Sequence, residues 1–499
     1  MPSTSPTDLT RQPIINGGLE VIKTAKQRIT ADIAIIGGGS GGLSVAAGAA
    51  QMGAKVVLVE KGKMGGDCLN TGCVPSKALI AAAKAAEVVR TAGKFGVNGH
   101  EPAVDFARVN AHVRDVIAGI APHDSIERFE GLGVQVIQAA AKFVSPTEIE
   151  AGDHRIKARR FVVATGSSPA LPPIPGLAEV PYLTNETVFD LAELPDHLIV
   201  IGGGPIGVEL AQAHRRLGTP VTLIEACTLM SKDDPEAVEI LRRRLIAEGI
   251  DLREGVHIAR VERQANGVAV VLEGNDDETF SILGSHLLVA AGRRANVDGL
   301  GLEAAGVRFS AKGIEVDARL RSSNKRVFAI GDVVGAYQFT HMAAYHAGIV
   351  IRNALFRLPA KVKYHAVPWV TFSDPELAHV GLNEAGARAR HGQVRVLSWS
   401  FADNDRARAE RDTEGLIKVV VGRKGRILGA TIVSRHAGEL IMPWVLSMDR
   451  NLKIGAMANL IAPYPTLSEV SKRVAGSYYT GTLFGGRTRR LVRALQWLG

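Results

Sequence analysis

Two cysteines stand close together in the stretch DCLNTGCVPSK, residues 67–77: Cys68 and Cys73, with four residues between them. Such a pair could form a structural disulfide, supply half of a metal site, or act as a redox-active dithiol. The chain of 499 residues has only three cysteines, too few for the disulfide framework of an extracellular protein. We therefore expect a cytoplasmic protein, in which a structural disulfide would not persist, so a redox or metal role is favoured.

The residues after the first cysteine indicate how the second thiol is positioned. The segment CVPSKALIAAAKAAEVV, from Cys73, has the composition of a helix, and Pro75 suits its first turn. Cys73 would then lie at the positive end of the helix dipole, which stabilises a thiolate, and Lys77 adds a positive charge one turn later. No cysteine or histidine pair completes a four-ligand zinc set. We predict a reactive dithiol, no metal site, and an unreactive thiol at Cys227.

Two stretches of the sequence share a strand–glycine–helix pattern. The strand DIAII at 32–36 is followed by GGGSGG and an alanine-rich helical stretch, and the strand LIVI at 198–201 by GGGPIG and a helix to about residue 217. Each unit continues into a second strand that ends in a glutamate, 18 residues after the third glycine. The residues concerned are Gly37, Gly39, Gly42 and Glu60 in the first unit and Gly202, Gly204, Gly207 and Glu225 in the second.

This pattern is typical of dinucleotide-binding folds. The glycines allow a pyrophosphate to approach the helix N-terminus, and the acid binds the ribose hydroxyls. One G-x-G-x-x-G match is weak evidence, but two in the same context favour two dinucleotide sites over two unrelated glycine turns. One site would hold a flavin permanently and the other an exchanging nicotinamide. Glu225 favours NAD(H) over NADP(H) because it would repel a 2′-phosphate, whereas Arg215 and Arg216 on the intervening helix weaken this preference.

With these motifs the chain resembles the class I pyridine nucleotide–disulfide oxidoreductases, the group of dihydrolipoyl dehydrogenase, glutathione reductase and mercuric reductase. The resemblance extends from about residue 32 to about residue 473. Besides GGGSGG and GGDCLNTGCVPSK, the shared motifs are VVATGSSP at 162–169, GGGPIGVE at 202–209, VAAGRRAN at 289–296 and FAIGDVVG at 328–335.

The resemblance implies roles for the site residues. Cys68 is the interchange thiol that meets the substrate, Cys73 is the charge-transfer thiol against the flavin, and Lys77 lies near flavin N5, paired with Glu209. NADH would reduce FAD, FAD the disulfide, and the dithiol an acceptor, or electrons would flow backwards from a dithiol substrate to NAD. The other implied FAD-binding residues are Thr165, Gly166, Gly331, Asp332 and His341, the last either at the flavin edge or merely packed, and the other NAD-binding residues are Gly292 and Arg293.

The C-terminal part departs from the disulfide-reducing members of the group. Those proteins carry a His-Pro-Thr-x-x-Glu motif that reaches the partner's cysteines in a homodimer, and its histidine handles the proton of thiol–disulfide exchange. Here IAPYPTLSEV, 461–470, places Tyr464 at the histidine position and retains Glu469. Tyrosine, with an ordinary pKa of about 10, accepts a proton poorly at neutral pH. Mercuric reductases also lack this histidine, but they end in a vicinal cysteine pair, whereas the last cysteine here is Cys227.

Three functional hypotheses follow from these observations. The first is an FAD- and NADH-dependent reductase of the mercuric reductase type, which passes electrons through the dithiol to a metal ion or another soft acceptor. The second is an enzyme like dihydrolipoyl dehydrogenase that acts on an unusual dithiol or disulfide. The third is a flavoprotein that serves chiefly as a membrane-associated partner through its C-terminal tail.

The expected fold class is α/β, with two Rossmann-like domains for FAD and NAD and a C-terminal α/β dimerisation domain. Segments along the chain are an N-terminal extension (1–30), an FAD-binding domain (31–166 and 288–352), an NAD(P)-binding domain (167–287), a dimerisation domain (353–482) and a tail (483–499). The tail is basic and amphipathic, so it would pack within the homodimer or make a weak membrane-surface contact. The net charge is +9, but the sequence contains no recognisable nucleic-acid-binding module, so we expect no nucleic-acid partner.

Overall fold

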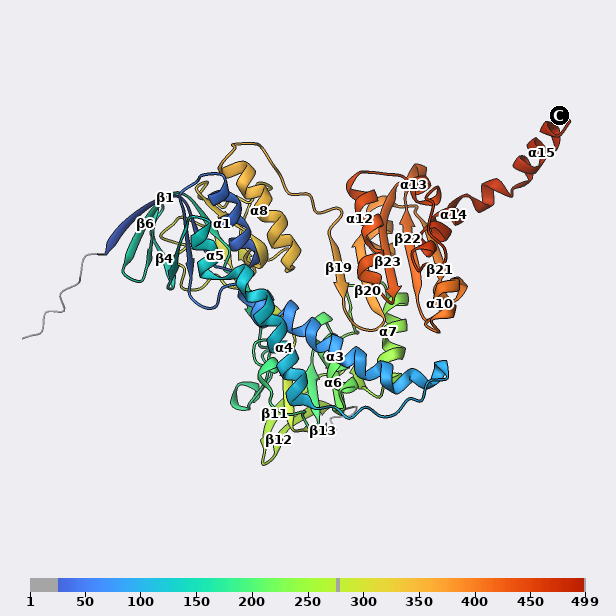
Figure 1. Ribbon diagram of the computed structural model, residues 1–499, viewed down its shortest axis with the longest axis horizontal. Helices are drawn as coiled ribbons and strands as arrows, with labels where there is room; N and C mark the ends of the chain where they lie inside the picture. The colour runs from blue at the N-terminus through green and yellow to red at the C-terminus, as the bar shows by residue number, and fades with distance from the viewer. Residues whose placement is uncertain (1–25, 275–278, 498–499) are drawn as a thin grey trace, which may run out of the picture.

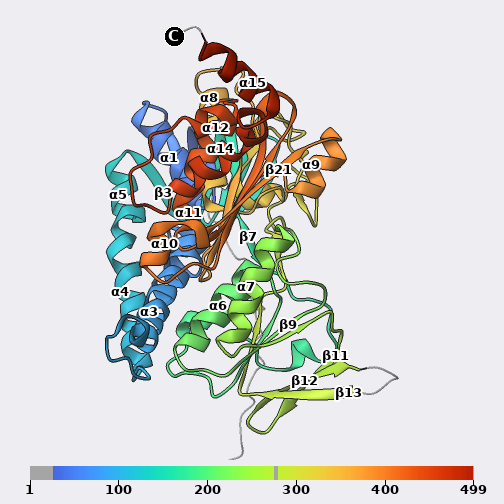
Figure 2. The ribbon, with the colours of Figure 1, turned by 90° about the vertical axis from the view of Figure 1, so that its right-hand side faces the viewer.

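The computed structural model describes residues 26–274 and 279–497, which form three lobes (Figure 1 and Figure 2). Residues 1–25 of the expected N-terminal extension lie outside this range. Its last residues, 27–30, belong to the first strand, where they pair in parallel with residues 154–157. The strand therefore starts earlier than the apolar run at 32–36 indicates, because in its first part only alternate residues, Ile29 and Ala31, are buried.

The first lobe is built on a seven-stranded sheet in the order β3-β2-β1-β6-β5-β4, with β18 also paired to β6. β18 comes far later in the chain than its neighbours, so this lobe is discontinuous in sequence. Its strands are β1 (Gln27–Ile36), β2 (Val56–Glu60), β3 (Val134–Gln138), β4 (Ala141–Ser145), β5 (Glu148–Ala151), β6 (His154–Val163) and β18 (Val327–Ala329). Its helices include α1 (Ser40–Gln51), α4 (Phe106–Ile120), α5 (Ile126–Gly131) and α8 (Thr340–Ala354).

The second lobe has a parallel sheet in the order β10-β9-β8-β14 and a separate antiparallel sheet, β11-β12-β13. The chain enters it after β7 (Ser167–Pro169) and leaves it at β15 (Arg293–Ala295), and these two strands pair with each other. The parallel strands are β8 (Leu198–Ile201), β9 (Val221–Glu225), β10 (Asp251–Glu254) and β14 (His286–Val289). The other elements are α6 (Pro205–Arg216), α7 (Pro235–Ala247), β11 (Ile258–Gln264), β12 (Gly267–Glu273) and β13 (Thr279–Gly284).

The third lobe is an antiparallel sheet in the order β19-β20-β23-β22-β21, covered by helices. Its central strand β23 is buried along its whole length, as expected for a strand with neighbours on both sides and a helical layer on one face. The strands are β19 (Pro368–Thr371), β20 (Glu376–Gly381), β21 (Arg395–Ser400), β22 (Leu416–Val421) and β23 (Ile427–Ser434). The helices are α9 (Glu384–His391), α10 (Asp405–Ala409), α11 (Ala437–Leu440), α12 (Met442–Asp449), α13 (Ile454–Ala458) and α14 (Glu469–Leu483).

The tail forms helix α15 (Gly486–Leu495), which projects away from the third lobe in Figure 1. None of its residues is buried, and Leu491, Val492 and Leu495 are exposed together with the arginines. The amphipathic pattern expected from the sequence is therefore present as a free helix in the single chain. Across the described part of the chain, no helix is long and apolar enough to cross a membrane.

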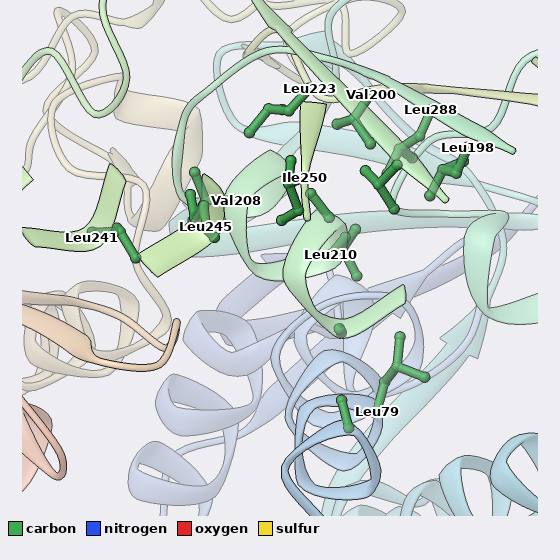
Figure 3. Packing of buried hydrophobic residues seen from close by; sticks show 14 of the residues in the cluster. Leu79, Leu198, Val200, Val208, Leu210, Leu223, Leu241, Leu245, Ile250 and Leu288 are labelled. Carbon is green, nitrogen blue, oxygen red and sulfur yellow. The ribbon is translucent and has the colours of Figure 1, made fainter. Parts of the chain in front are cut away.

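A large apolar core fixes the position of the thiol pair relative to the second lobe. Helix α2 (Gly66–Asn70) and helix α3 (Cys73–Thr91) follow β2, and α3 packs against α6. Figure 3 shows Leu79 of α3 lying beneath Val208 and Leu210 of α6, which in turn cover the second lobe's sheet. Each fully buried leucine is worth about 2 kcal/mol. The helix that begins at Cys73 is thus held against the helix that begins at the second glycine loop.

Candidate active site

The two glycine loops have nearly the same backbone geometry. Gly37 and Gly202 adopt φ values of 109° and 113°, a region that L side chains rarely occupy. A Cβ at Gly37 would lie 2.3 Å from the carbonyl oxygen of Ala164, and one at Gly202 would lie 2.5 Å from that of Ala290. Glycine is therefore required at the first position of both loops, because the loop passes directly over the neighbouring strand's end.

The second and third glycines of each loop serve different needs. A Cβ at Gly42 would lie 1.8 Å from the oxygen of Gly37, and one at Gly207 would lie 1.9 Å from that of Gly202, so both permit the loop to close on itself. Around Gly204 a Cβ would meet nothing within 4 Å, and at Gly39 only a backbone atom at 3.8 Å. Open space thus lies at the N-terminus of both α1 and α6, where a phosphate group is stabilised.

The two strand-end glutamates also have matching contacts. The carboxylate of Glu60 accepts hydrogen bonds from the backbone N–H groups of Gly38, at 2.5 Å, and Gly62, at 2.6 Å. That of Glu225 accepts from Gly203, at 2.7 Å, and Cys227, at 2.9 Å. Each acid is held beside its own glycine loop, at the place where a ribose would follow the pyrophosphate.

The thiol pair lies at the start of α3. Cys68 belongs to α2, and Cys73 is the first residue of α3; both are free thiols, and their side chains hydrogen-bond to each other. The hydrogen bond from Cys68 is the largest cause that lowers the pKa of Cys73, to about 6, and the Thr340 hydroxyl and the Lys77 ammonium lower it further. The same thiol contact raises the pKa of Cys68, as does its burial. Cys73 is therefore the thiolate of the pair at neutral pH.

The structure brings Lys77 and Glu209 together. Nζ of Lys77 lies 2.6 Å from Oε2 of Glu209, which is buried on α6. The other carboxylate oxygen, Oε1, accepts a hydrogen bond of 2.8 Å from the backbone N–H of Phe372. Nζ also lies 4.5 Å from the centre of the Phe372 ring, within range of a cation–π contact. All three lobes thus meet at this ion pair, and Phe372 was not among the residues expected at the site.

Arg293, which the resemblance implies for the nicotinamide site, contacts the thiol loop. Its guanidinium donates hydrogen bonds to Oδ2 of Asp67 at 2.9 Å, to Oγ of Ser167 at 2.8 Å and to Oδ1 of Asn185 at 3.2 Å. Asp67 directly precedes Cys68. Arg293 therefore braces the thiol loop from the strand on which the chain returns to the first lobe. The neighbouring Gly292, with φ of 139°, lies in open space.

The expected flavin-binding residues gather around the ends of β6 and β18. The hydroxyl of Thr165 donates to the carbonyl oxygen of Asn296 at 2.7 Å, and the N–H of Asn296 donates to that of Gly166 at 3.0 Å. Asp332 accepts a hydrogen bond of 2.6 Å from Ser167, and burial raises the pKa of this carboxyl. These contacts place two features at one edge of the first sheet: the segments where the chain leaves and re-enters this lobe, and the Gly331–Asp332 pair. A ligand of this fold binds at such an edge.

Two histidines on α8 behave differently. His341 hydrogen-bonds to the carbonyl oxygen of Pro368 at 3.0 Å and stacks on Phe339, and burial lowers its pKa. His346, which the sequence did not single out, accepts a hydrogen bond of 3.2 Å from the N–H of Gly331, and burial lowers its pKa to about 4. His346 is therefore a neutral support of the Gly331–Asp332 pair.

Tyr464 and Glu469 lie in the third lobe and have separate partners. The Tyr464 hydroxyl donates a hydrogen bond of 3.0 Å to Oδ2 of Asp405, and its side chain is 69% exposed. This bond is the largest cause that raises the pKa of Tyr464 above its ordinary value. Glu469, the first residue of α14, pairs with Arg473 at 2.7 Å. Both residues line one hollow of about 420 Å³ on the surface of the third lobe.

Two dinucleotide-type lobes joined at a thiol pair define a class of oxidoreductase that uses a flavin. The chain belongs to the pyridine nucleotide-disulphide oxidoreductase family: residues 31–347 match that family, and residues 367–475 match its dimerisation domain. Both the expected family and the expected α/β fold class are thereby confirmed. The dimerisation domain supports a homodimer.

Relatives with two different names are about equally similar to the chain. The mercuric reductase of Streptomyces lividans is 36% identical over 455 residues, which cover 90% of this chain and 96% of that protein. The dihydrolipoyl dehydrogenase of Geobacillus stearothermophilus is 35% identical over 456 residues, with the same two coverages, 90% and 96%. Overall identity therefore places the chain in the family without choosing between the two activities.

Solved structures of the same kind superpose over nearly the whole chain. LpdA from Mycobacterium tuberculosis is 28% identical, with a TM-score of 0.81, and the match covers 91% of this chain and 99% of that one. The Cu(II) complex of the HOCl-induced flavoprotein disulfide reductase RclA from Escherichia coli is 27% identical, with a TM-score of 0.80, over 90% and 99% of the two chains. These matches confirm the three-lobe architecture.

The residues present fit the family's cofactors, FAD and a pyridine nucleotide. The open space over Gly39 at the start of α1 would take the pyrophosphate of FAD, with Glu60 at its ribose and Asp332 at the ribitol. The open space over Gly204 and the carboxylate of Glu225 would hold the nicotinamide dinucleotide in the same way. Cys73 and Lys77 lie on α3, which packs against α6, the helix that carries Glu209 and begins at the second glycine loop.

Proposed function

We propose that this protein is an FAD- and NADH-dependent reductase of the mercuric reductase type, which delivers two electrons through Cys68 and Cys73 to a metal ion or another soft acceptor. FAD, when bound, supplies the two-electron exchange between the nicotinamide and the disulfide. The chain's own residues bind the acceptor at Cys68, keep Cys73 as a thiolate, and neutralise charge through Lys77. The choice of acceptor rests on one observation, the protonated phenol of Tyr464.

Tyr464 is unsuited to the proton transfer that disulfide substrates require. Its hydroxyl already donates to Asp405, and the carboxylate raises the pKa of the phenol, so the group stays protonated at neutral pH. A base that serves thiol–disulfide exchange needs a pKa near the working pH. Being 69% exposed on the dimerisation lobe, Tyr464 is free to meet the partner subunit, as its position in the family motif implies.

A metal ion held by thiolates avoids this requirement. Because Cys73 is already a thiolate at neutral pH, oxidation of the pair to the Cys68–Cys73 disulfide releases two electrons and one proton, from Cys68. These electrons reduce one M(II) ion to the metal or two M(II) ions to M(I), and the sulfur ligands are soft donors that suit such ions. Among the similar proteins, several are named mercuric reductases, and two of the similar solved structures are Cu(II) complexes. These names support a soft metal ion as the acceptor of this chain.

The surroundings of Glu225 support NADH as the donor. The two arginines that weakened this preference lie at the far end of α6, a helix of 12 residues and thus about 18 Å long. Arg215 donates to the carbonyl oxygen of Glu248 at 2.8 Å, and Arg216 is buried in ion pairs with Glu248 and Asp374. Both are engaged away from the ribose position, which leaves Glu225 to exclude a 2′-phosphate.

The alternative is an enzyme like dihydrolipoyl dehydrogenase that acts on an unusual dithiol, and it is favoured by the equal similarity to that relative. The test is a comparison of purified holoenzyme with dihydrolipoamide and NAD, and with NADH and Hg(II), under the same conditions. The proposal expects slow dihydrolipoamide oxidation and faster Hg(II)-dependent NADH oxidation. Rapid oxidation of dihydrolipoamide by the unmodified enzyme would replace the proposal with the alternative.

A further inference from the structure

Asp67 is the most heavily bonded side chain of the thiol loop. Its Oδ1 accepts hydrogen bonds from the Thr71 hydroxyl at 2.7 Å and from Nδ2 of Asn185 at 3.1 Å, and its Oδ2 accepts from Nη2 of Arg293 at 2.9 Å. Asp67 immediately precedes Cys68, and Thr71 lies two residues before Cys73. The carboxylate therefore ties both ends of the loop that separates the two sulfurs.

Asn185 repeats this bridge from outside the loop. Its Nδ2 donates both to Oδ1 of Asp67 and, at 3.1 Å, to the carbonyl oxygen of Thr71, while its Oδ1 accepts from Nη1 of Arg293. The residue is 7% exposed and comes from the segment before the second lobe's sheet. The Asn185 amide does not use all of its hydrogen-bonding positions. Its NH₂ group and its carbonyl oxygen both bond to the same small group of residues, Asp67, Thr71 and Arg293.

Arg293 connects this cluster to the expected flavin-binding edge. Besides Asp67 and Asn185, it donates to the hydroxyl and the carbonyl oxygen of Ser167, each at 2.8 Å. The Ser167 hydroxyl in turn donates to Asp332. One guanidinium thus sits between a carboxylate beside Cys68 and the hydroxyl that holds Asp332, and its charge offsets that of Asp67.

We propose that Asp67, Asn185 and Arg293 form a clamp that positions Cys68 and Cys73 for closure of the disulfide and links that geometry to Asp332. The clamp deepens the proposed function, since it concerns the same thiols. A disulfide needs its two Cα atoms within about 4.4–6.8 Å, so a loop held at both ends keeps the sulfurs near bonding distance. The backbone leaves little slack, because a Cβ at Gly72 would lie 2.9 Å from the oxygen of Asp67.

The clamp also makes an electrostatic prediction that a purely structural role does not. The negative charge of Asp67 disfavours the Cys73 thiolate. The positive charge of Arg293, which is paired with Asp67, offsets that effect. Asp67→Asn should therefore lower the pH at which Cys73 ionises, and Arg293→Gln should raise it. Loss of loop structure alone would move both variants in the same direction. Opposite shifts in the thiolate titration of the reduced enzyme support the clamp, and parallel shifts or no shifts overturn it.

Asn185→Ala tests positioning without a change of charge. We expect the Cys68–Cys73 couple to shift about tenfold towards the dithiol in a glutathione redox buffer, because the loop loses a buried brace. The readout is the fraction of disulfide in the holoenzyme after acid quench and alkylation. The control is Asn110→Ala: Asn110 is also 7% exposed and bonds to the carbonyl oxygen of Leu191, away from the thiols. Equal shifts in the two variants would contradict the clamp.

These outcomes are separable from the proposed function. The titration and the redox buffer report on the thiols whatever the electron acceptor is, so the clamp can hold for either kind of enzyme. Conversely, unchanged acceptor reduction in Cys68→Ser would remove the dithiol from the proposed function while leaving the clamp measurements valid for the wild-type loop.

Discussion

Lys77 and Glu209 join two helices that are far apart in the sequence, through a contact of 2.6 Å between Nζ and Oε2. Helix α3 carries Lys77 one turn after Cys73, and α6 carries Glu209 one turn after the second glycine loop. The packing of α3 on α6 brings the two side chains together, and the N–H of Phe372 fixes the carboxylate from the third lobe. Residues from all three lobes therefore set the position of the Lys77 ammonium group, the positive charge near the thiols.

Replacement of Glu209 by alanine should destabilise the protein. Lys77 would lose its partner, and the N–H of Phe372 would lose its acceptor, at a cost of about 1–3 kcal/mol for a buried donor left without a partner. Glu209→Gln should cost less because the amide oxygen can still accept from Phe372. Urea unfolding of both variants measures the difference. Equal stabilities of the two variants would show that the Phe372 contact contributes nothing.

The nucleotide preference should depend on Glu225. Glu225→Ala should raise kcat/KM for NADPH relative to NADH by about tenfold, since the repulsion of a 2′-phosphate would be gone. Steady-state NADH and NADPH oxidation with one acceptor gives the ratio. Glu60→Ala is the matched control, because Glu60 has the same contacts in the first lobe and should leave this ratio unchanged. A wild-type preference for NADPH would contradict the assignment of Glu225.

The Cys73 thiolate should disappear as the pH falls through about 6, because its pKa is lowered to about that value. In Cys68→Ala the largest cause of this lowering is lost while burial and Asp67 still oppose ionisation, so the transition should move to higher pH. Ultraviolet thiolate absorbance of the reduced protein measures it. Both proteins should carry Cys227→Ser, so that only the loop thiols titrate. An unmoved transition would exclude Cys68 as the cause.

Tyr464→His should create a proton acceptor at the position where the disulfide-reducing members carry one. We expect dihydrolipoamide oxidation to increase by about tenfold or more, in line with the contribution of a positioned general base. Tyr464→Phe removes the hydrogen bond to Asp405 without adding a base and should give no increase. If phenylalanine and histidine had the same effect, the proton-transfer explanation of the tyrosine would fail.

Local patterns in the sequence predicted the parts of the site that are built from neighbouring residues. The strand at 198–201, the helix that starts at Cys73 and the two glycine loops follow from burial, capping and backbone requirements that act within a few residues. The Lys77–Glu209 contact could be anticipated only through the resemblance to a known family, because its partners are 132 residues apart.

The contacts that no sequence pattern predicted are made by single side chains between lobes. Asn185, Phe372 and Asp405 were not expected as site residues, and each acts through one or two hydrogen bonds that only the folded chain creates. Arg293 was identified through its motif, but its hydrogen bonds to Asp67 and Asn185 were not anticipated, since the motif gives its strand and not the direction of its side chain. Asp67 could have been identified from the sequence, because it is an ionisable residue next to a reactive cysteine, but no motif includes that criterion.

In the proposed function, electrons reach a soft acceptor through Cys68. Anaerobic NADH oxidation by the holoenzyme should be compared with Hg(II), Cu(II), lipoamide, glutathione disulfide and quinones as acceptors, each with wild type and Cys68→Ser. We expect the metal ions to be reduced faster than either disulfide, and Cys68→Ser to abolish this activity. Equal rates for the variant with every acceptor, or a faster reaction with lipoamide than with the metal ions, would contradict it.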